Sequence, residues 1–317
     1  MICKKTILSL CASAVLLPAF TSCTNDETFD PLADGPVPMT FTAGIDGVAT
    51  RATATAFEAV DMVGIIPMKD GSVESAQANR AYTYNGSAFE AGSPYYFQDR
   101  DAVTFNAYYP YYENFANDYT IAIDTRAENQ TVEIVNGGYS WNKNDYLFAS
   151  AETDVNKPTV SFTGEDHAFK HVMSSIVFKF IAGTADGVAY LEPLTGYTLG
   201  SLVVNGTFDC KTGKATAQSD GTAESITVDG ISCAEKETEH FSAPLIVLPQ
   251  DVPGGKFTLT VKYNNADYTA ALTLDRLAAG TRYEFPVTIK NTGLEIGGAE
   301  IKNWESGQTY GGDATLK

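Results

Sequence analysis

Histidine, tryptophan, cysteine and basic side chains are all scarce in this chain. It holds 3 His, 2 Trp and 5 Cys, and 21 Lys plus Arg against 39 Asp plus Glu give a net charge of −18 at pH 7. A chain this acidic repels phosphate backbones, so we expect no nucleic-acid partner, and it lacks the basic patch of a membrane-surface protein. The hydrophobic fraction of 44% predicts a folded protein rather than a disordered one.

Motifs for catalysis and cofactor binding are also missing. The sequence contains no GxSxG, P-loop or HExxH motif, and no CxxC pair. His167 and His171 would share a metal only on a helix, and the residues after them predict a strand. We therefore expect no enzyme activity, no metal and no cofactor. Cys210 and Cys233 either pair in a disulfide or remain free thiols, and the sequence leaves both open.

The N-terminus carries a targeting segment. Lys4 and Lys5 precede an apolar run, Ile7–Phe20, that is too short for a transmembrane helix. The run ends just before Cys23, in a pattern that resembles the lipobox of bacterial lipoproteins. This resemblance implies that residues 1–22 are a lipoprotein signal peptide and that Cys23 is acylated, for example with palmitate, and anchors the chain in the outer membrane. An ordinary signal peptide is the alternative. The acidic run Thr24–Glu27 fits either a surface-export signal or a solvated tether.

The segment Met39–Ala52 organises our interpretation of the rest. Met39, Phe41, Ala43 and Ile45 alternate with Thr40 and Thr42, which is typical of a strand with one buried face. A Gly/Ala/Thr-rich stretch with Arg51 follows and predicts an exposed loop that a protease can reach. We therefore predict a strand over 39–45 that can be cut loose. The alternative is a chain that is never processed at Arg51.

Strand signals with turn residues every 8–12 positions recur to the end of the chain, and helical periodicity is nearly absent. Roughly fourteen short strands of this kind predict an all-β protein of two β-sandwiches, divided near residues 164–166; one large closed sheet is the alternative. The clearest predicted hairpin pairs Lys256–Tyr263 with Tyr268–Leu274. Asn264 and Asn265 lie at its turn, which we expect to include Ala266 and Asp267.

Several motifs together resemble the fimbrillin family of anaerobic Gram-negative bacteria. They occur in the family's order along almost the whole chain: the lipobox at Cys23, FTAGI at 41–45, TRA at 50–52, FEAVDMVGI at 57–65, HAFKH at 167–171, LIVLP at 245–249 and IKNWESG at 301–307. One departure is Val60, because the family's usual form has glycine before the aspartate that follows.

The resemblance implies two tandem transthyretin-like β-sandwich domains and a removable N-terminal strand. The implied division is a signal peptide over 1–22, a tether and removable strand over 23–51, an N-terminal sandwich over 52–165 that strand 39–45 completes before processing, and a C-terminal sandwich over 166–317. An Arg-specific protease would cut between Arg51 and Ala52. The strand with Met39, Phe41, Ala43 and Ile45 would then leave, and a strand from another subunit would replace it.

The function implied is that of a structural subunit of a surface fimbria on the outer membrane, supporting adhesion, with other fimbrial subunits as partners in a homo- or heteropolymer. The C-terminal stretch Gly307–Lys317 lacks the large alternating apolar residues of a donor strand, so a stalk, anchor, tip or accessory role stays open. Leu294–Trp304 is either a donor or an integral strand. The alternative function is a non-polymerising lipoprotein that binds glycans or other host or bacterial surface ligands through Tyr95, Tyr96, Tyr109 and Tyr111.

Overall fold

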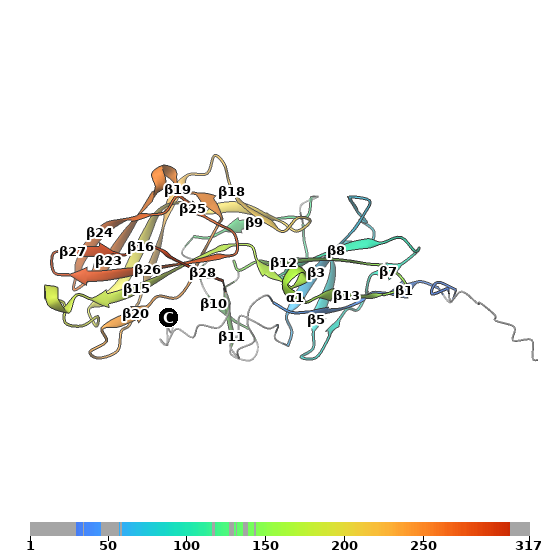
Figure 1. Ribbon diagram of the computed structural model, residues 1–317, viewed down its shortest axis with the longest axis horizontal. Coiled ribbons are helices and arrows are strands. Elements are labelled where there is room, and N and C mark those ends of the chain that lie inside the picture. The colour runs from blue at the N-terminus through green and yellow to red at the C-terminus, as the bar shows by residue number, and fades with distance from the viewer. Residues whose placement is uncertain are drawn as a thin grey trace, which may run out of the picture.

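The protein is built from β-strands almost throughout, as predicted. The computed structural model describes residues 30–33, 35–45, 57, 59–115, 118–126, 130, 132–135, 139–142 and 144–304. Helical turns within these ranges are α1 (Gly164–His167), η2 (Thr184–Asp186) and η3 (Pro253–Gly255). The molecule is elongated, with strands of the first half of the chain at one end and strands of the second half at the other (Figure 1). No described helix has the length and apolar character needed to cross a bilayer.

A seven-stranded sheet dominates the first half. Its order is β14-β12-β8-β3-β5-β6, and β4 pairs with β3. Two small pairs, β1 with β7 and β2 with β13, accompany it. The strands are β1 (Val37–Pro38), β2 (Thr40–Ala43), β3 (Met62–Lys69), β4 (Ser72–Val73), β5 (Arg80–Tyr84), β6 (Phe89–Glu90), β7 (Tyr96–Phe97), β8 (Val103–Tyr109), β12 (Leu147–Thr153), β13 (Thr159–Phe162) and β14 (Lys170–His171).

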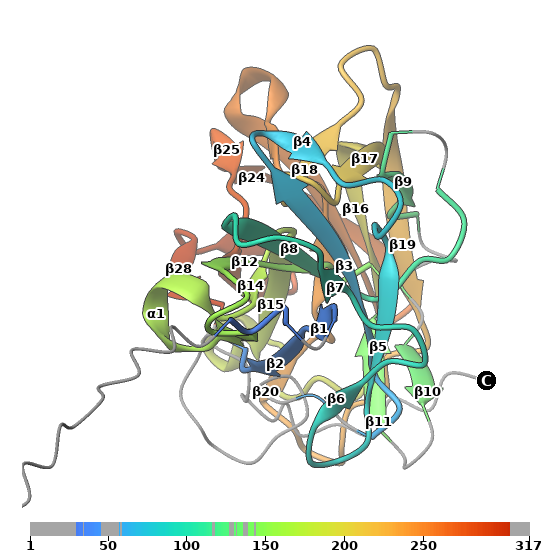
Figure 2. The ribbon, with the colours of Figure 1, turned by 90° about the vertical axis from the view of Figure 1, so that its right-hand side faces the viewer.

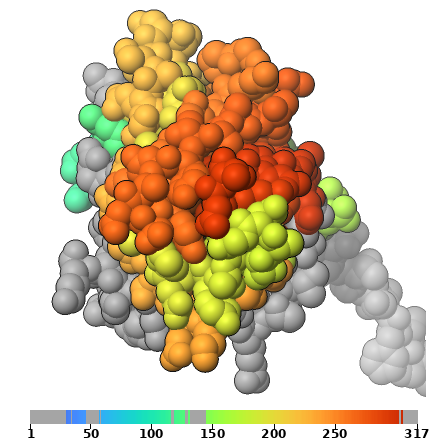
Figure 3. All heavy atoms as spheres, turned by 90° about the vertical axis from the view of Figure 1, so that its left-hand side faces the viewer, coloured from blue at the N-terminus to red at the C-terminus, as the bar shows by residue number. Residues whose placement is uncertain are grey.

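A six-stranded and a four-stranded sheet form the second half and enclose one apolar core. The order is β20-β15-β26-β27 in the first, with β21 on β15 and β28 on β26, and β19-β16-β23-β24 in the second. The strands are β15 (Ser174–Ala182), β16 (Leu194–Val203), β19 (Ala223–Asp229), β20 (Glu239–Phe241), β21 (Leu245–Val247), β23 (Lys256–Tyr263), β24 (Ala266–Thr273), β26 (Thr281–Lys290), β27 (Gly293–Ile296) and β28 (Glu300–Asn303). Figure 3 views this end, where the orange and red segments after residue 256 lie beside the yellow-green segment near residue 180.

A third sheet joins the two halves. Strand β9 (Thr120–Asp124) comes from the first half and pairs with β17 (Asn205–Asp209), which pairs in turn with β18 (Lys214–Ala217). Beside it, Ile66, Tyr108, Phe208 and Leu248 belong to one buried cluster with residues from both halves. The remaining strands form two short pairs: β10 (Val132–Val135) with β11 (Tyr139–Asn142), and β22 (Gln250–Asp251) with β25 (Arg276–Leu277).

The predicted all-β pattern is confirmed, but the described residues form 28 strands, many of two to five residues, where roughly fourteen were predicted. The predicted hairpin also needs a correction. Strands β23 and β24 pair as predicted, but the turn contains only Asn264 and Asn265, with φ of 51° and 59°. Ala266 and Asp267 are the first residues of β24, because two consecutive residues with positive φ already close the hairpin. The division into two tandem sandwich domains stays a prediction; β14 joins the sheet of the first half although it follows the predicted boundary at 165.

Candidate functional site: the N-terminal strand and its slot

Strand β2 lies against a single strand partner. It pairs in parallel with β13, with Thr40 opposite Thr159 and Ala43 opposite Phe162. The ladder continues at both ends, where the Thr40 amide donates to the Pro158 carbonyl at 3.0 Å and the Gly44 amide donates to the Phe162 carbonyl at 2.9 Å. Within the part of the chain that the structure describes, β13 pairs with no other strand. Removing β2 would therefore leave the backbone groups of β13 without a ladder.

The side chains of β2 alternate between core and solvent. Met39, Phe41 and Ile45 are 1%, 5% and 7% exposed and Ala43 is half-buried, whereas Thr40 and Thr42 are exposed. The alternation arises because successive side chains of a strand point to opposite faces. The buried face is what the sequence pattern predicts for this segment.

Phe41 is the centre of this buried face. Its ring stacks on Phe89 with centroids 4.6 Å apart, and it meets the edges of Tyr82 at 5.1 Å and Phe162 at 5.4 Å. Such aromatic contacts stabilise beyond the area that they bury, by about 0.5–1.5 kcal/mol each. The rings of Tyr82, Phe89 and Phe162 thus form an apolar slot that the Phe41 side chain of β2 fills. Figure 2 shows β1 and β2 in dark blue.

The residues on either side of the segment 46–56, Ile45 and Phe57, both contact Phe169. Ile45 forms a parallel bridge with Phe169, whose amide donates to the Gly44 carbonyl at 2.9 Å. Phe57 is also buried, and its ring meets the ring of Phe169 at 5.1 Å. The chain therefore leaves β2 and returns to the core at the same place. Arg51 and Ala52 belong to this segment and, like Cys23, lie outside the described residues.

The start of β2 is fixed by a second contact. Strand β1 pairs with β7, with Val37 opposite Phe97, and the Met39 amide donates to the Tyr95 carbonyl at 2.8 Å. Residues 37–45 thus interact first with β7 and then with β13. Sequence reasoning missed both partners, because β13 is more than a hundred residues away and periodicity carries no information on pairing.

Comparison with known proteins shows to which family this chain belongs. The profile of the fimbrillin-like family matches residues 50–304. The chain belongs to the fimbrillin-like family. This fimbrillin-like chain is 28% identical to a candidate fimbrium subunit, Fim1C, of Bacteroides uniformis, over 97% of each chain.

Solved structures resemble this fimbrillin-like chain in fold. A candidate cell adhesion protein of Bacteroides ovatus is 26% identical, with a TM-score of 0.70 over 86% of this chain and all (100%) of that one. A candidate cell adhesion protein of Bacteroides uniformis is 23% identical, with a TM-score of 0.64 over 85% and 99%. The second likeness bears on the fold alone.

Two of the aromatic residues suggested as a ligand surface are in the core. Tyr95 and Tyr109 are 2% and 6% exposed, and their hydroxyls donate to Glu74 and Asp61. Burial, together with these carboxylates, raises the pKa of both phenols. Neither ring has a free face for stacking on a sugar, so both are corrected here to packing residues. Tyr96 is exposed and Tyr111 is half-buried.

The two histidines considered as a metal pair lie in different surroundings. His167 Nδ1 contacts the Ser150 carbonyl at 2.9 Å, whereas His171 Nδ1 contacts Asp145 at 2.7 Å and its ring stacks on Trp304. The two histidines thus have different partners.

The segment Leu294–Trp304 contains β27 and β28, both paired with β26, and is therefore integral to its sheet in this structure. All of Gly307–Lys317, like residues 305 and 306, lies outside the described part.

Proposed function

We propose that this chain is a structural, non-catalytic subunit of a cell-surface fimbria and that β2 is a removable strand. The chain would be exported as a lipoprotein, anchored in the outer membrane through Cys23, cut after Arg51 and joined to other fimbrial subunits by strand exchange. Membership in the fimbrillin-like family supports the fimbrial role. The single observation that favours exchange is that β2 is the only described strand paired with β13.

The physical basis is edge completion. A slot that has lost its strand exposes a row of unpaired amides and carbonyls beside apolar pockets. A strand from another subunit can satisfy the same backbone groups, while its alternate side chains enter the pockets left by Met39, Phe41 and Ile45. While it is attached, β2 blocks this surface and prevents premature assembly.

Energetics explain why cutting would be needed. Burial of these three side chains stabilises the seated strand by on the order of 4–8 kcal/mol. A strand that is also covalently tied at Phe57 rebinds at once after any opening. Cleavage at Arg51 removes that tether at a position where both flanking anchors, Ile45 and Phe57, can remain in the core until exchange.

Protease treatment tests the proposal. The full chain is incubated with an Arg-specific protease and examined by mass spectrometry and by gel electrophoresis in sodium dodecyl sulfate. We expect a cut between Arg51 and Ala52, followed by a ladder of oligomers that resist the detergent. A synthetic peptide with the sequence 39–45, added during cleavage, should occupy the slot and suppress the ladder.

Two arginine variants give the matched control. Arg51→Ala should abolish both the cut and the ladder, whereas Arg276→Ala, at an arginine side chain that is 71% exposed, should leave both unchanged. Cleaved protein that remains monomeric would contradict strand exchange and favour the alternative, a surface lipoprotein that binds glycans or other ligands. In that case Tyr96 and Tyr111 are the residues to replace.

A further inference from the structure

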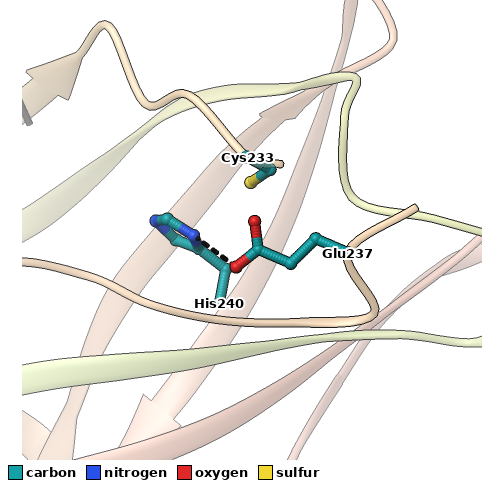
Figure 4. A group of neighbouring side chains, drawn as sticks. All are labelled: Cys233, Glu237 and His240. Atoms are coloured by element: carbon teal, nitrogen blue, oxygen red, sulfur yellow. Dashed lines mark hydrogen bonds and ion pairs between the residues drawn. The ribbon is translucent and has the colours of Figure 1, made fainter. Parts of the chain in front are cut away.

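Three side chains with metal-binding donors converge at the far end of the molecule from β2. Cys233, Glu237 and His240 point toward one another on the segment that leads into β20 (Figure 4). Their donor atoms, one sulfur, one carboxylate oxygen and one imidazole nitrogen, all lie within 4.8 Å of one another. No metal is predicted from the sequence, because the chain lacks a CxxC pair and because a strand follows His167 and His171. The Cys-x₃-Glu-x₂-His spacing matches neither pattern.

The backbone holds these donors in place. His240 belongs to β20 and lies opposite Phe180 of β15. The Glu237 amide donates to the Ala234 carbonyl at 3.1 Å, and the Glu237 carbonyl accepts from the Leu191 amide at 2.8 Å. The three residues are therefore positioned by a sheet and a hydrogen-bonded turn, independently of any ligand.

Side-chain contacts also orient the donors. His240 Nδ1 lies 3.0 Å from one oxygen of Glu237, and the other oxygen accepts from the Ala234 amide. The imidazole and carboxylate are largely shielded, with side-chain exposures of 10% and 21%. Cys233 is half-buried against the core of the second half. A pre-oriented set of this kind requires little rearrangement to receive an ion.

The segment that carries the cluster is rich in acidic residues. Glu192, 44 residues earlier in the chain, accepts a hydrogen bond from the Lys236 amide at 3.1 Å. Glu235 and Glu239 lie two residues before and two residues after Glu237. Glu235 contacts Lys236, and Glu239 contacts Lys179. The carboxylates of this segment thus outnumber its ammonium groups.

We propose that Cys233, Glu237 and His240 bind one zinc(II) ion, with water in a fourth position. Thiolate, imidazole and carboxylate are the protein ligands of zinc, in tetrahedral sites with bonds of about 2.0–2.3 Å. Calcium and magnesium prefer sites made of oxygen alone, so the cysteine and histidine disfavour them. On binding, the thiol proton passes to solvent, the sulfur bonds to zinc, and no electron is transferred.

Calorimetric titration of the reduced, full-length protein with zinc chloride tests the site. We expect saturable binding to the wild type that is lost in the cluster variants, and no comparable heat from calcium chloride. Cobalt(II) in place of zinc should give a thiolate-to-metal charge-transfer absorption, which reports the sulfur bond directly. Absence of zinc binding, or cobalt binding without that absorption, would overturn the proposal.

Each ligand has a matched control in the same chain. Cys233→Ser, Glu237→Gln and His240→Gln should each weaken zinc binding by more than about 100-fold, since even loss of an outer hydrogen-bond partner typically costs ~10–100-fold. Cys210→Ser, Glu235→Gln and His167→Gln should leave the affinity within about threefold of the wild type, because none of these residues lies in the cluster. Equal affinities in Cys233→Ser and the wild type would overturn the assignment.

A second measurement needs no variant and so avoids any failure to fold. Zinc should slow alkylation of Cys233 by iodoacetamide at least tenfold, read by mass spectrometry, whereas calcium should not. Unchanged alkylation of Cys233 at saturating zinc would contradict coordination by its sulfur.

Discussion

At the scale of single residues, Val60 has a backbone conformation that favours glycine. The resemblance to the fimbrillin family leads us to expect glycine at this place, and Val60 adopts a φ of 83°. That region is costly for any residue with a Cβ and above all for a β-branched one. The conformation is imposed from both sides, because the Val60 amide donates to the Tyr84 carbonyl at 2.8 Å and β3 begins two residues later.

Replacing this valine should stabilise the protein. Val60→Gly relieves about 1–2 kcal/mol of left-handed strain and adds about 0.5–1 kcal/mol of backbone entropy cost. We expect a net gain of roughly 0.5–1 kcal/mol, because the lost side chain is 48% exposed and buries little. Urea unfolding measures this gain. The control Val73→Gly, at a strand residue, should destabilise, and a loss of stability in Val60→Gly would show that the strain is absent.

At the scale of elements, the two faces of β2 differ in what they contribute. Phe41 contacts three aromatic rings, whereas Thr42, the next residue, is exposed. A strand that only covered the surface would be insensitive to changes on either face. A strand seated in a slot is sensitive on one face alone.

Alanine substitutions at neighbouring positions of β2 test this difference. Phe41→Ala should destabilise the uncut protein by about 3–5 kcal/mol, as expected for loss of a buried aromatic side chain, and Thr42→Ala by less than about 0.5 kcal/mol. Thermal or urea unfolding of both variants gives the comparison. Similar small effects in the two variants would mean that β2 is not held by its apolar face.

Elements formed by local pairing were predictable from sequence, and elements formed by distant pairing were not. The β23–β24 hairpin follows from alternation on both sides of Asn264 and Asn265. Nothing local indicates that β9 pairs with β17 or that β2 pairs with β13, because alternation reveals a buried face but not its neighbour. A removable strand was predicted from the sequence, whereas the residues that surround it, on β13 and in the aromatic cluster, are known only from the structure.

The same limit applies to the proposed zinc site at Cys233, Glu237 and His240. Glu237 and His240 are close in sequence and would suggest a ligand pair only if the turn after Cys233 were known. The positive φ of Lys236, 60°, helps to turn the chain so that these side chains meet. A backbone conformation that is rare for lysine carries no sequence signal.

At the scale of the whole molecule, buried tyrosines occur in all three apolar clusters. Tyr82 lies in the first-half core, Tyr197 in the second-half core, and Tyr108 and Tyr146 in the cluster between them. Burial raises the pKa of Tyr82 and of Tyr146 to about 12, from 10.0. In the folded protein these phenols stay neutral at a pH where the unfolded chain ionises.

Alkaline pH should therefore unfold the protein. A folded pKa above the unfolded one contributes stability that is complete below about pH 10 and is lost as pH rises toward 12. A rise from 10 to about 12 corresponds to roughly 3 kcal/mol for each such tyrosine. Urea unfolding between pH 8 and pH 12 should show this decline, and Tyr146→Phe should show less of it. A variant that declines as steeply as the wild type would contradict the assignment.

The parallel direction of β2 against β13 has a consequence for any fibre built by exchange. A replacement that reuses the same backbone bonds must run the same way, so each subunit would receive its neighbour in one orientation only. Such head-to-tail contacts do not close on themselves unless the rotation between subunits allows a ring. The polymer would be polar, with an empty slot at one terminus and an unshared strand at the other. It would lengthen at the first terminus by accepting a strand and at the second by donating one.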